Sequence, residues 1–136
     1  MTTINAYLNF NGTCREAMIF YKNCFGGELM FQTVSESPYA DKMPKEKQQH
    51  ILHSTLTKRD LLLLASDMGN EMINGNTITL AADFEFEREI RECFTKLSGG
   101  GKIVVPLDKT FWGGMLGMLT DKYGYTWSLN HTEEKK

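Results

Sequence analysis

The sequence predicts an α+β fold made of two β-α-β-β-β modules, and three observations lead to this prediction. Apolar and polar residues alternate from Ile4 to Phe10, which is the period of a half-buried strand. Apolar residues at helical spacing follow, and this pattern stops at Gly26-Gly27. The same succession of strand, helix and glycine stop then begins again near Thr77. Residue identity between the two halves is low, so the repeat is one of pattern.

The first module is expected to cover about residues 1–68. Its first strand places Asn5, Tyr7 and Asn9 on the face opposite Ile4, Ala6, Leu8 and Phe10. Thr13 to Glu16 has the T-x-x-E form of a helix capping box. The helix is expected to bury Ala17, Phe20, Tyr21, Cys24 and Phe25. Three further strands are expected at 28–34, 51–57 and 61–66.

The second module is expected at about residues 76–131, after a linker at 69–75, and both modules form a single domain. Its first strand, Thr77 to Ala81, places Thr77, Thr79 and Ala81 on the face opposite Ile78 and Leu80. Acidic residues then lie in the first turns of a helix, which suits the helix dipole. The predicted apolar face of this helix comprises Phe86, Ile90, Cys93, Phe94 and Leu97. Strands are expected at 102–107, 114–120 and 126–130.

Composition narrows the possible functions. The chain has 136 residues, 41% of them hydrophobic and 24% charged, as expected for one ordinary globular domain. No apolar run approaches the roughly 20 residues of a membrane span, and the N-terminus does not resemble a signal peptide. The net charge is −2 and the basic residues are scattered, which argues against nucleic-acid binding. The three cysteines form no C-x-x-C pair, which favours free thiols and a cytoplasmic location.

One helix per module can cover only one face of each sheet. The opposite faces of the two first strands carry polar or small side chains: Asn5, Tyr7 and Asn9 in one, Thr77, Thr79 and Ala81 in the other. Such a face is either the wall of a water-accessible pocket or simply a surface exposed to solvent.

Three segments carry a resemblance to a known family: YLNFNGTCREAMIFYKNCFGGEL, HSTLTKRDLLLLASD and KIVVPLDKTFWGGMLGMLTDKYGYTWSLN. Together they cover most of the chain, and in them it resembles the vicinal oxygen chelate (glyoxalase/bleomycin-resistance/dioxygenase) superfamily, in its PhnB-like branch. The resemblance implies curved half-barrel sheets around a cup-shaped pocket, and a homodimer. The branch often carries a demethylubiquinone methyltransferase-like label. No glycine-rich strand-turn-helix unit supports methyl transfer here.

The metal-dependent relatives place His, Glu or Gln at four pocket-facing strand positions. Carried over to this sequence, three of these positions fall on Asn5, Thr77 and Ser128. The fourth lies within Leu61 to Ser66, which contains no carboxylate or imidazole. Amide and hydroxyl oxygens are weak ligands for the transition metals that such sites use. We therefore expect no tightly bound metal and no other cofactor.

Several other residues are candidates for either a functional or a structural role. His53 is the candidate catalytic residue, as a general base or a pocket hydrogen-bond donor, or else a half-buried structural histidine on the same strand face as Ile51. His50 and His131 are expected at the surface. Asp67 either anchors a ligand or caps a turn. Trp112 either roofs the pocket or packs in the subunit interface. Residues 35–49 form either a mobile lid or a surface connection.

The main functional hypothesis is a protein that binds a small organic molecule without the metal chelate. Its expected ligand-binding residues are Asn5, Tyr7, Asn9, His53, Asp67, Thr77, Thr79, Trp112 and Ser128. The alternatives are a lyase, isomerase or dioxygenase assisted by a metal or by His53, and a protein that sequesters an antibiotic. An enzyme needs converging titratable groups, whereas a binding protein needs only shape and apolar walls.

Overall fold

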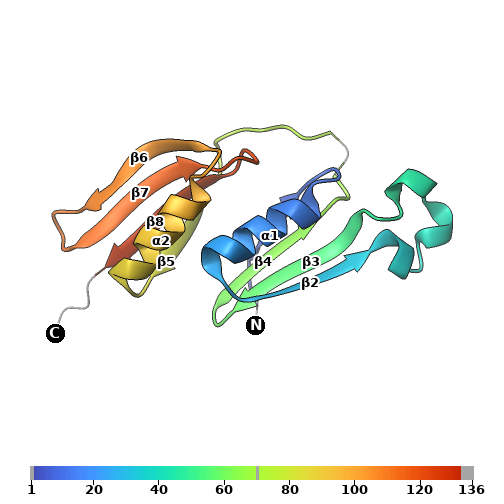
Figure 1. Ribbon diagram of the computed structural model, residues 1–136, viewed down its shortest axis with the longest axis horizontal. Helices are drawn as coiled ribbons and strands as arrows, with labels where there is room; N and C mark the ends of the chain where they lie inside the picture. Colours follow the sequence, from blue (N-terminus) through green and yellow to red (C-terminus); the bar gives the residue numbers. More distant parts are fainter. Residues whose placement is uncertain (1, 70, 133–136) are drawn as a thin grey trace. The chain divides into compact units, whose positions relative to one another are not determined.

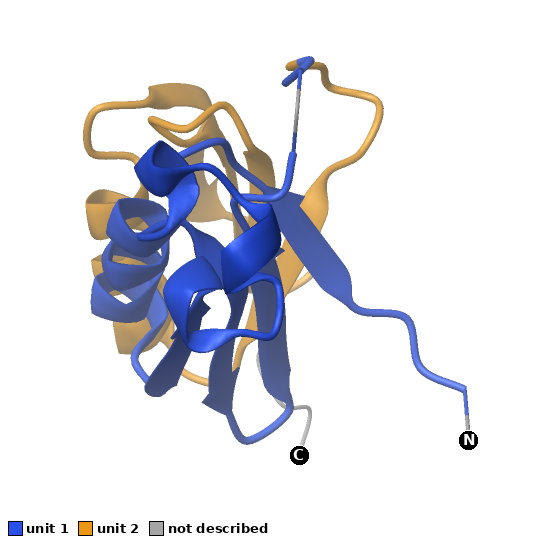
Figure 2. Cartoon of the chain, turned by 90° about the vertical axis from the view of Figure 1, so that its right-hand side faces the viewer, with its two compact units in different colours: residues 1–73 blue, residues 74–136 orange. Residues whose placement is uncertain are grey.

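The computed structural model describes residues 2–69 and 71–132 of the chain. The chain divides into two compact units, Met1–Ile73 and Asn74–Lys136 (Figure 2). Each unit contains one four-stranded mixed sheet and one α-helix in the order β-α-β-β-β (Figure 1). The predicted α+β class is therefore confirmed, and neither sheet closes into a barrel. Among the described residues, no helix is long and apolar enough to span a membrane.

The first unit contains β1 (Ala6–Asn9), α1 (Cys14–Phe25), β2 (Glu28–Thr33), β3 (Ile51–Lys58) and β4 (Leu61–Ser66). The strands are arranged in the order β1-β4-β3-β2. Strand β1 pairs with β4 in parallel, and the other pairs are antiparallel. Helix α1 contacts β2, β3 and β4 on one face of this sheet.

The core of the first unit lies between α1 and the sheet. Leu8 and Phe10 are buried as the alternation predicts, but Ile4 precedes β1 and is 97% exposed, so the prediction for Ile4 is wrong. With only four residues, β1 pairs along β4 from Ala6 onward, which leaves Ile4 without a neighbouring strand. The helix buries a face shifted by one position from the predicted one: Cys14, Ala17, Met18 and Tyr21.

Strand β3 contains a β-bulge at Leu52. Gln32 pairs with His53, but the next residue of β2, Thr33, pairs with Ile51. A bulge of this kind interrupts the alternation of side chains between the two faces. Ile51 is consequently fully buried on the helix side, whereas His53 is exposed on the other face. The prediction that His53 shares a face with Ile51 is thus wrong, because a period of two does not survive a bulge, and of the two alternatives for His53 the half-buried structural histidine is not what the structure shows.

The segment between β2 and β3 consists of three 3-10 turns, Val34–Glu36, Ala40–Lys42 and Lys45–Lys47, and we call residues 34–49 the arm. The backbone N–H and the hydroxyl of Thr33 donate to Glu36 Oε1 at 3.0 and 2.7 Å, and both bonds lower the pKa of Glu36. The Gln48 side chain donates to the carbonyl oxygens of Ala40 and Met43 at 2.8 and 3.0 Å. The arm therefore has defined internal hydrogen bonds.

The second unit contains β5 (Leu80–Phe84), α2 (Glu87–Leu97), β6 (Lys102–Lys109), β7 (Gly114–Thr120) and β8 (Thr126–Thr132). The strands lie in the order β5-β8-β7-β6, with β5 parallel to β8. Helix α2 contacts β5 and β8. It buries four of its five predicted apolar residues: Ile90, Cys93, Phe94 and Leu97.

Three predictions for the second unit are wrong. The first strand begins at Leu80 rather than Thr77, so Ile78 is exposed instead of facing the helix. Phe86 is the N-cap of α2 and is also exposed, because a residue before the first turn does not share the helical face. His131 is buried rather than at the surface, since β8 extends to Thr132 and the His131 ring bonds the Phe84 carbonyl oxygen at 2.9 Å.

Candidate functional site

The sheet face opposite α1, which we call the open face of the first unit, carries three of the nine predicted ligand-binding residues: Tyr7, Asn9 and His53. The pairing register aligns Tyr7, Leu64, Thr55 and Met30 across the four strands in one row. Tyr7 is 46% exposed and Met30 is 70% exposed, while Leu64 and Thr55 are half-buried. This central row is uncharged and combines apolar surface with two hydroxyl groups.

His53 and Asn9 lie on the same face as this row, one step further along their strands. His53 pairs with Gln32 of β2, and Asn9 pairs with Ser66 of β4. Both His53 and Asn9 are exposed. Of the predicted residues, Tyr7, Asn9 and His53 therefore come together on one face. Asn5 precedes β1 and is exposed, and its side chain donates to the Thr3 hydroxyl at 3.3 Å.

Asp67, in contrast, lies on the helix side of the sheet and is only 4% exposed. Its Oδ1 accepts hydrogen bonds from the backbone N–H groups of Gly12 and Cys14, at 2.7 and 3.0 Å. Its Oδ2 accepts the Ile51 N–H at 2.8 Å. Thr13 makes no side-chain cap, and the carboxylate that follows β4 binds the N–H groups on either side of Thr13, at the start of α1. The predicted capping box at Thr13 to Glu16 is thus wrong.

The second unit has an equivalent open face, opposite α2. One row across its strands is Ala81, Ser128, Met118 and Val105, again without charge. Ser128 is half-buried in this row. Thr77 and Thr79 both precede β5 and are exposed, so they are not strand residues of this face. Their predicted strand positions are wrong because the alternating pattern at 77–81 begins before strand pairing does.

Trp112 lies with Phe111 at the tip of the β6–β7 hairpin. The two rings contact each other edge to face, with centroids 4.8 Å apart. Phe111 is 97% exposed and Trp112 about half exposed. Gly113, with φ of +90°, completes the turn, which removes the segment from extended geometry.

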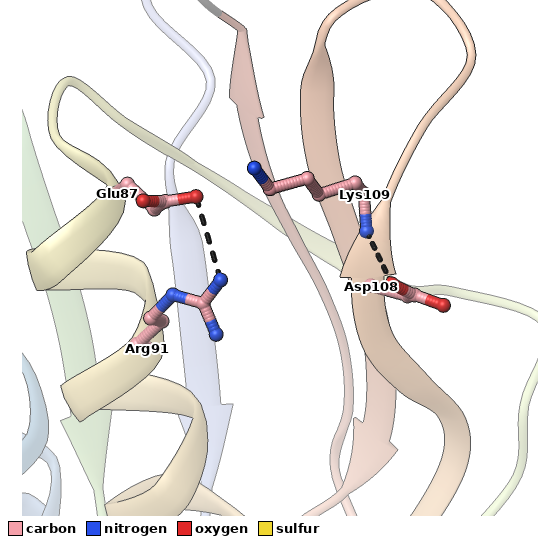
Figure 3. Close-up of polar contacts among 4 residues, drawn as sticks. All are labelled: Glu87, Arg91, Asp108 and Lys109. Atoms are coloured by element: carbon pink, nitrogen blue, oxygen red, sulfur yellow. Dashed lines mark hydrogen bonds and ion pairs between the residues drawn. The ribbon is translucent and has the colours of Figure 1, made fainter.

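Two further aspartates, Asp108 and Asp121, accept hydrogen bonds from nearby backbone N–H groups. Asp108 accepts a hydrogen bond from the Lys109 backbone N–H at 2.8 Å (Figure 3). The same figure shows the exposed ion pair between Glu87 and Arg91 on α2, at 3.4 Å. Asp121 accepts the N–H groups of Tyr123 and Tyr125, and its Oδ2 accepts the Trp127 indole N–H at 2.8 Å. Trp127 is buried, whereas its neighbour Ser128 is half-buried.

A shallow cavity of about 510 Å³ lies beside the start of α1 in the first unit. The residues that line it are Gly12, Arg15, Glu16, Ile19, Gln49 and Asp67. Asp67 contributes a carboxylate whose two oxygens already accept backbone bonds. The Arg15 guanidinium lies over the Phe31 ring, 4.9 Å from its centroid. The charges of this cavity are therefore largely engaged within the protein.

The donor set does not match a tightly held transition metal. Within residues 2–69 and 71–132, no group of three or more His, Cys, Asp or Glu side chains is arranged to hold a metal ion. Cys14, Cys24 and Cys93 are free thiols; Cys14 and Cys93 are buried and Cys24 is half-buried. Burial raises the pKa of the Cys14 thiol to about 12, and the nearby Asp67 carboxylate acts in the same direction.

Sequence reasoning left several open-face residues out of the site. Met30 and Gln32 of β2 lie on the same face as His53. The alternation of side chains between the two faces along Glu28–Thr33 could have identified them. Leu64 was hidden within a continuous run of leucines, which has no period of two. In the second unit, Met118 and Asn130 accompany Ser128, and Asn130 donates to Asp83 at 3.2 Å.

Comparison with known proteins agrees with this architecture. Protein YjdN of Escherichia coli (strain K12) is 28% identical over 142 residues, covering 97% of each chain. Protein PA1353 from Pseudomonas aeruginosa is 30% identical, with a TM-score of 0.85 over 98% of this chain and 100% of that one. A Bacillus cereus structure described as a putative 3-demethylubiquinone-9 3-methyltransferase, PhnB protein, is 26% identical, with a TM-score of 0.73 over 96% and 100%.

The family model of the Glyoxalase/Bleomycin resistance protein/Dioxygenase superfamily matches residues 3–129, nearly the whole chain. The resemblance identified from the sequence segments is thus confirmed, and its PhnB-like aspect is supported by the Bacillus cereus relative. With this match and the β-α-β-β-β pattern of both units, the chain belongs to the Glyoxalase/Bleomycin resistance protein/Dioxygenase superfamily.

Proposed function

We propose that this protein binds a small, uncharged organic molecule on the open face of the first unit. We further propose that it acts in the cytoplasm as a homodimer and without a resident metal ion. The observation that carries the proposal is the row Tyr7, Leu64, Thr55 and Met30, which leaves apolar and hydroxyl-bearing side chains uncovered by α1. Large apolar side chains that remain exposed together mark a binding surface more often than an ordinary surface.

The class of ligand follows from the charges of this face. A carboxylate or phosphate ligand is normally held by arginine, lysine or a helix N-terminus. The central row contains no charged side chain, and Glu28 lies at the margin in the next row, with Thr57 and Leu62. Aromatic and thioether groups contribute contact area, while Thr55 and His53 offer hydrogen bonds that orient a ligand. An uncharged molecule fits this combination best.

The metal-free part of the proposal rests on the types of residue at the family's ligand positions. Asn5, Thr77 and Ser128 offer amide and hydroxyl oxygens, and β4 offers leucine, alanine and serine. Zinc and its neighbours bind imidazole and carboxylate in preference. These residues do not fit a tightly bound transition metal, so no step of the proposed function involves one.

The alternative of an enzyme depends on His53. A histidine base in an active site is usually oriented by a second polar group. In the described part of the chain, the His53 imidazole donates no hydrogen bond to a carboxylate or carbonyl oxygen, which favours binding over catalysis. Sequestration of an antibiotic is one form of the proposed binding function, and the ligand that copurifies with the protein, identified by mass spectrometry, distinguishes it.

The test uses benzyl alcohol, benzoate and benzylamine, which share a ring and differ in charge. Each is titrated into the full-length protein while NMR follows the His53 imidazole and the Thr55 and Leu64 methyl resonances. We expect benzyl alcohol to shift these resonances at lower concentration than either charged molecule. His53→Ala should weaken benzyl alcohol by about 0.5–1.5 kcal/mol, the net value of one hydrogen bond.

A charge variant provides the control. Thr55→Lys should reverse the order and favour benzoate, because it places an ammonium group in the centre of the row. Thr95→Lys, an equivalent change on the exposed side of α2, should leave the order unchanged. Binding of all three molecules without any shift at His53, Thr55 or Leu64 would reject the open face as the site.

A further inference from the structure

Two asparagines of the sequence, Asn11 and Asn74, are followed directly by glycine. In such a pair the backbone nitrogen of the glycine can attack the side-chain carbonyl carbon of the asparagine, because the second residue has no side chain to hinder the approach. The attack also requires that the peptide group between the two residues can turn toward the asparagine side chain. The surroundings of the two glycine nitrogens therefore decide which pair reacts.

The pair Asn11 and Gly12 is held by the fold. The Gly12 N–H donates to Asp67 Oδ1 at 2.7 Å, and the same oxygen accepts the Cys14 N–H at 3.0 Å. Asp67 is only 4% exposed, so water has little access to these charge-assisted bonds. The Gly12 nitrogen can attack only after its bond to Asp67 is broken. The peptide group before Gly12 is thus fixed at the start of α1.

The pair Asn74 and Gly75 lies between β4 and β5, outside any helix or strand, and both residues are exposed. Among the described residues, the Gly75 N–H has no hydrogen-bond acceptor, and a Cβ on Gly75 would meet nothing within 4 Å. The Asn74 carboxamide lies beside Gly124, where an added Cβ would be 3.0 Å from Asn74 Oδ1. Within the described part of the chain, no hydrogen bond holds this carboxamide. Neither reacting group is therefore restrained by a hydrogen bond.

We propose that Asn74 is a site of spontaneous deamidation in the folded protein. The Gly75 nitrogen loses its proton and bonds to Asn74 Cγ, the Cγ–Nδ2 bond breaks, and ammonia leaves. Water then opens the cyclic imide, either at Cγ to give aspartate or at the backbone carbonyl carbon to give isoaspartate. Both products take the formal net charge of the chain from −2 to −3, and isoaspartate also lengthens the backbone that joins the two units. The reaction is independent of the proposed ligand.

The test follows both asparagines of the full-length protein in water labelled with heavy oxygen, because the water that opens the imide leaves its oxygen in the product. The folded protein is incubated at mildly alkaline pH and is then digested with trypsin in ordinary, mildly acidic water. Cleavage after Arg15, Arg59 and Arg88 places the two asparagines in separate peptides, 1–15 and 60–88. Fragment masses identify the labelled residue within each peptide.

We expect Asn74 of the folded protein to acquire the label many-fold faster than Asn11. In concentrated urea, where the bond between Gly12 and Asp67 is lost, the two rates should become similar. Equal labelling of the two asparagines in the folded protein would overturn the proposal. It would equally be overturned if Asn74 stayed unlabelled in the folded protein while both asparagines were labelled in urea.

The variant Gly75→Ala tests the route of the reaction. The added methyl group hinders the approach of the backbone nitrogen to Asn74 Cγ, so labelling of Asn74 should slow many-fold. Labelling of Asn11 and the unfolding midpoint should stay as in the wild type, because the new Cβ meets nothing within 4 Å. Labelling of Asn74 at the wild-type rate in Gly75→Ala would show that the oxygen does not enter through the imide, and the proposal would fail.

Discussion

At the scale of single residues, two buried aspartates serve the two units in similar ways. Asp67 accepts three backbone N–H groups, and Asp121 accepts two together with the Trp127 indole N–H. Each of these donors would otherwise be buried or partly buried without a partner, at a cost of about 1–3 kcal/mol. A buried carboxylate such as that of Asp67, which the sequence marked as a possible ligand anchor, can thus stabilise the fold.

Cys14 leads to a prediction about pH. Its pKa is raised from 9.0 to about 12, first by burial and then by Asp67. As the pH rises, the unfolded thiol ionises before the folded one, so the stabilising contribution is complete below about pH 9 and is lost between about pH 9 and about pH 12. When the pH is raised from about 8 to about 10, the free energy of unfolding should therefore fall more in the wild type than in Cys14→Ala. The difference between the two decreases should be about 1 kcal/mol.

Urea unfolding at both pH values measures this difference. Cys24→Ala is the matched control, because the Cys24 thiol is only half-buried on the same helix. An identical pH dependence in Cys14→Ala and the wild type would show that the Cys14 thiol is not perturbed.

At the scale of elements, the position of α2 depends on a glycine in the strand below it. A Cβ on Gly117 would lie 2.6 Å from Phe94 Cε2 and 3.0 Å from Leu107 Cα. Neither a packed aromatic ring nor a backbone can yield easily, so Gly117→Ala should lower the free energy of unfolding by about 1–3 kcal/mol. Gly75→Ala, whose Cβ would meet nothing within 4 Å, should change it little. Equal stabilities of the two variants in urea would contradict this account of the α2–β7 contact.

The arm provides a second prediction at this scale. Gln48 bonds the carbonyl oxygens of Ala40 and Met43, which joins the second 3-10 turn to the end of the arm. Gln48→Ala removes both bonds at a site remote from the core. We expect faster tryptic cleavage at Lys42, Lys45 or Lys47, with little change in the global unfolding midpoint.

The exposed neighbour Gln49 supplies the control variant, Gln49→Ala. Cleavage of Gln48→Ala at the wild-type rate would mean that the side-chain bonds of Gln48 do not hold the arm.

At the scale of the whole molecule, exposed apolar residues favour association with a second copy. Ile103, Val104 and Val105 of the edge strand β6 are all exposed. The register shifts in β6 and Pro106, which has no backbone N–H, prevent regular strand pairing along this edge. We therefore expect two copies of the chain to associate through the side chains of these residues. Light scattering at micromolar concentration should give about 31 kDa, twice the 15.5 kDa of one chain. A species of 15.5 kDa across a concentration series would be evidence for a monomer.

The amino-acid sequence by itself determined the succession of elements, because burial imposes a period of two on strands and 3.6 on helices. Strands β4 and β7 were predicted to the residue, and helical spacing identified four of the five residues assigned to the apolar face of α2. Family membership could also be identified from sequence segments, since most of the chain carries the resemblance. These features depend on the spacing of apolar and polar residues within short segments, which can be read directly from the sequence.

Only the tertiary structure decided which side chains meet on the open face. The bulge at Leu52 places Ile51 on the helix side although His53 lies on the open face, and both backbone groups of Ile51 bind Asp67, which follows β4 and is distant in sequence from β3. Strand β5 begins at Leu80 because that is where β8 offers a partner, and so Thr77 and Thr79 fall outside it. Register and bulges are set by pairing between distant segments, and pairing leaves no local periodic signal.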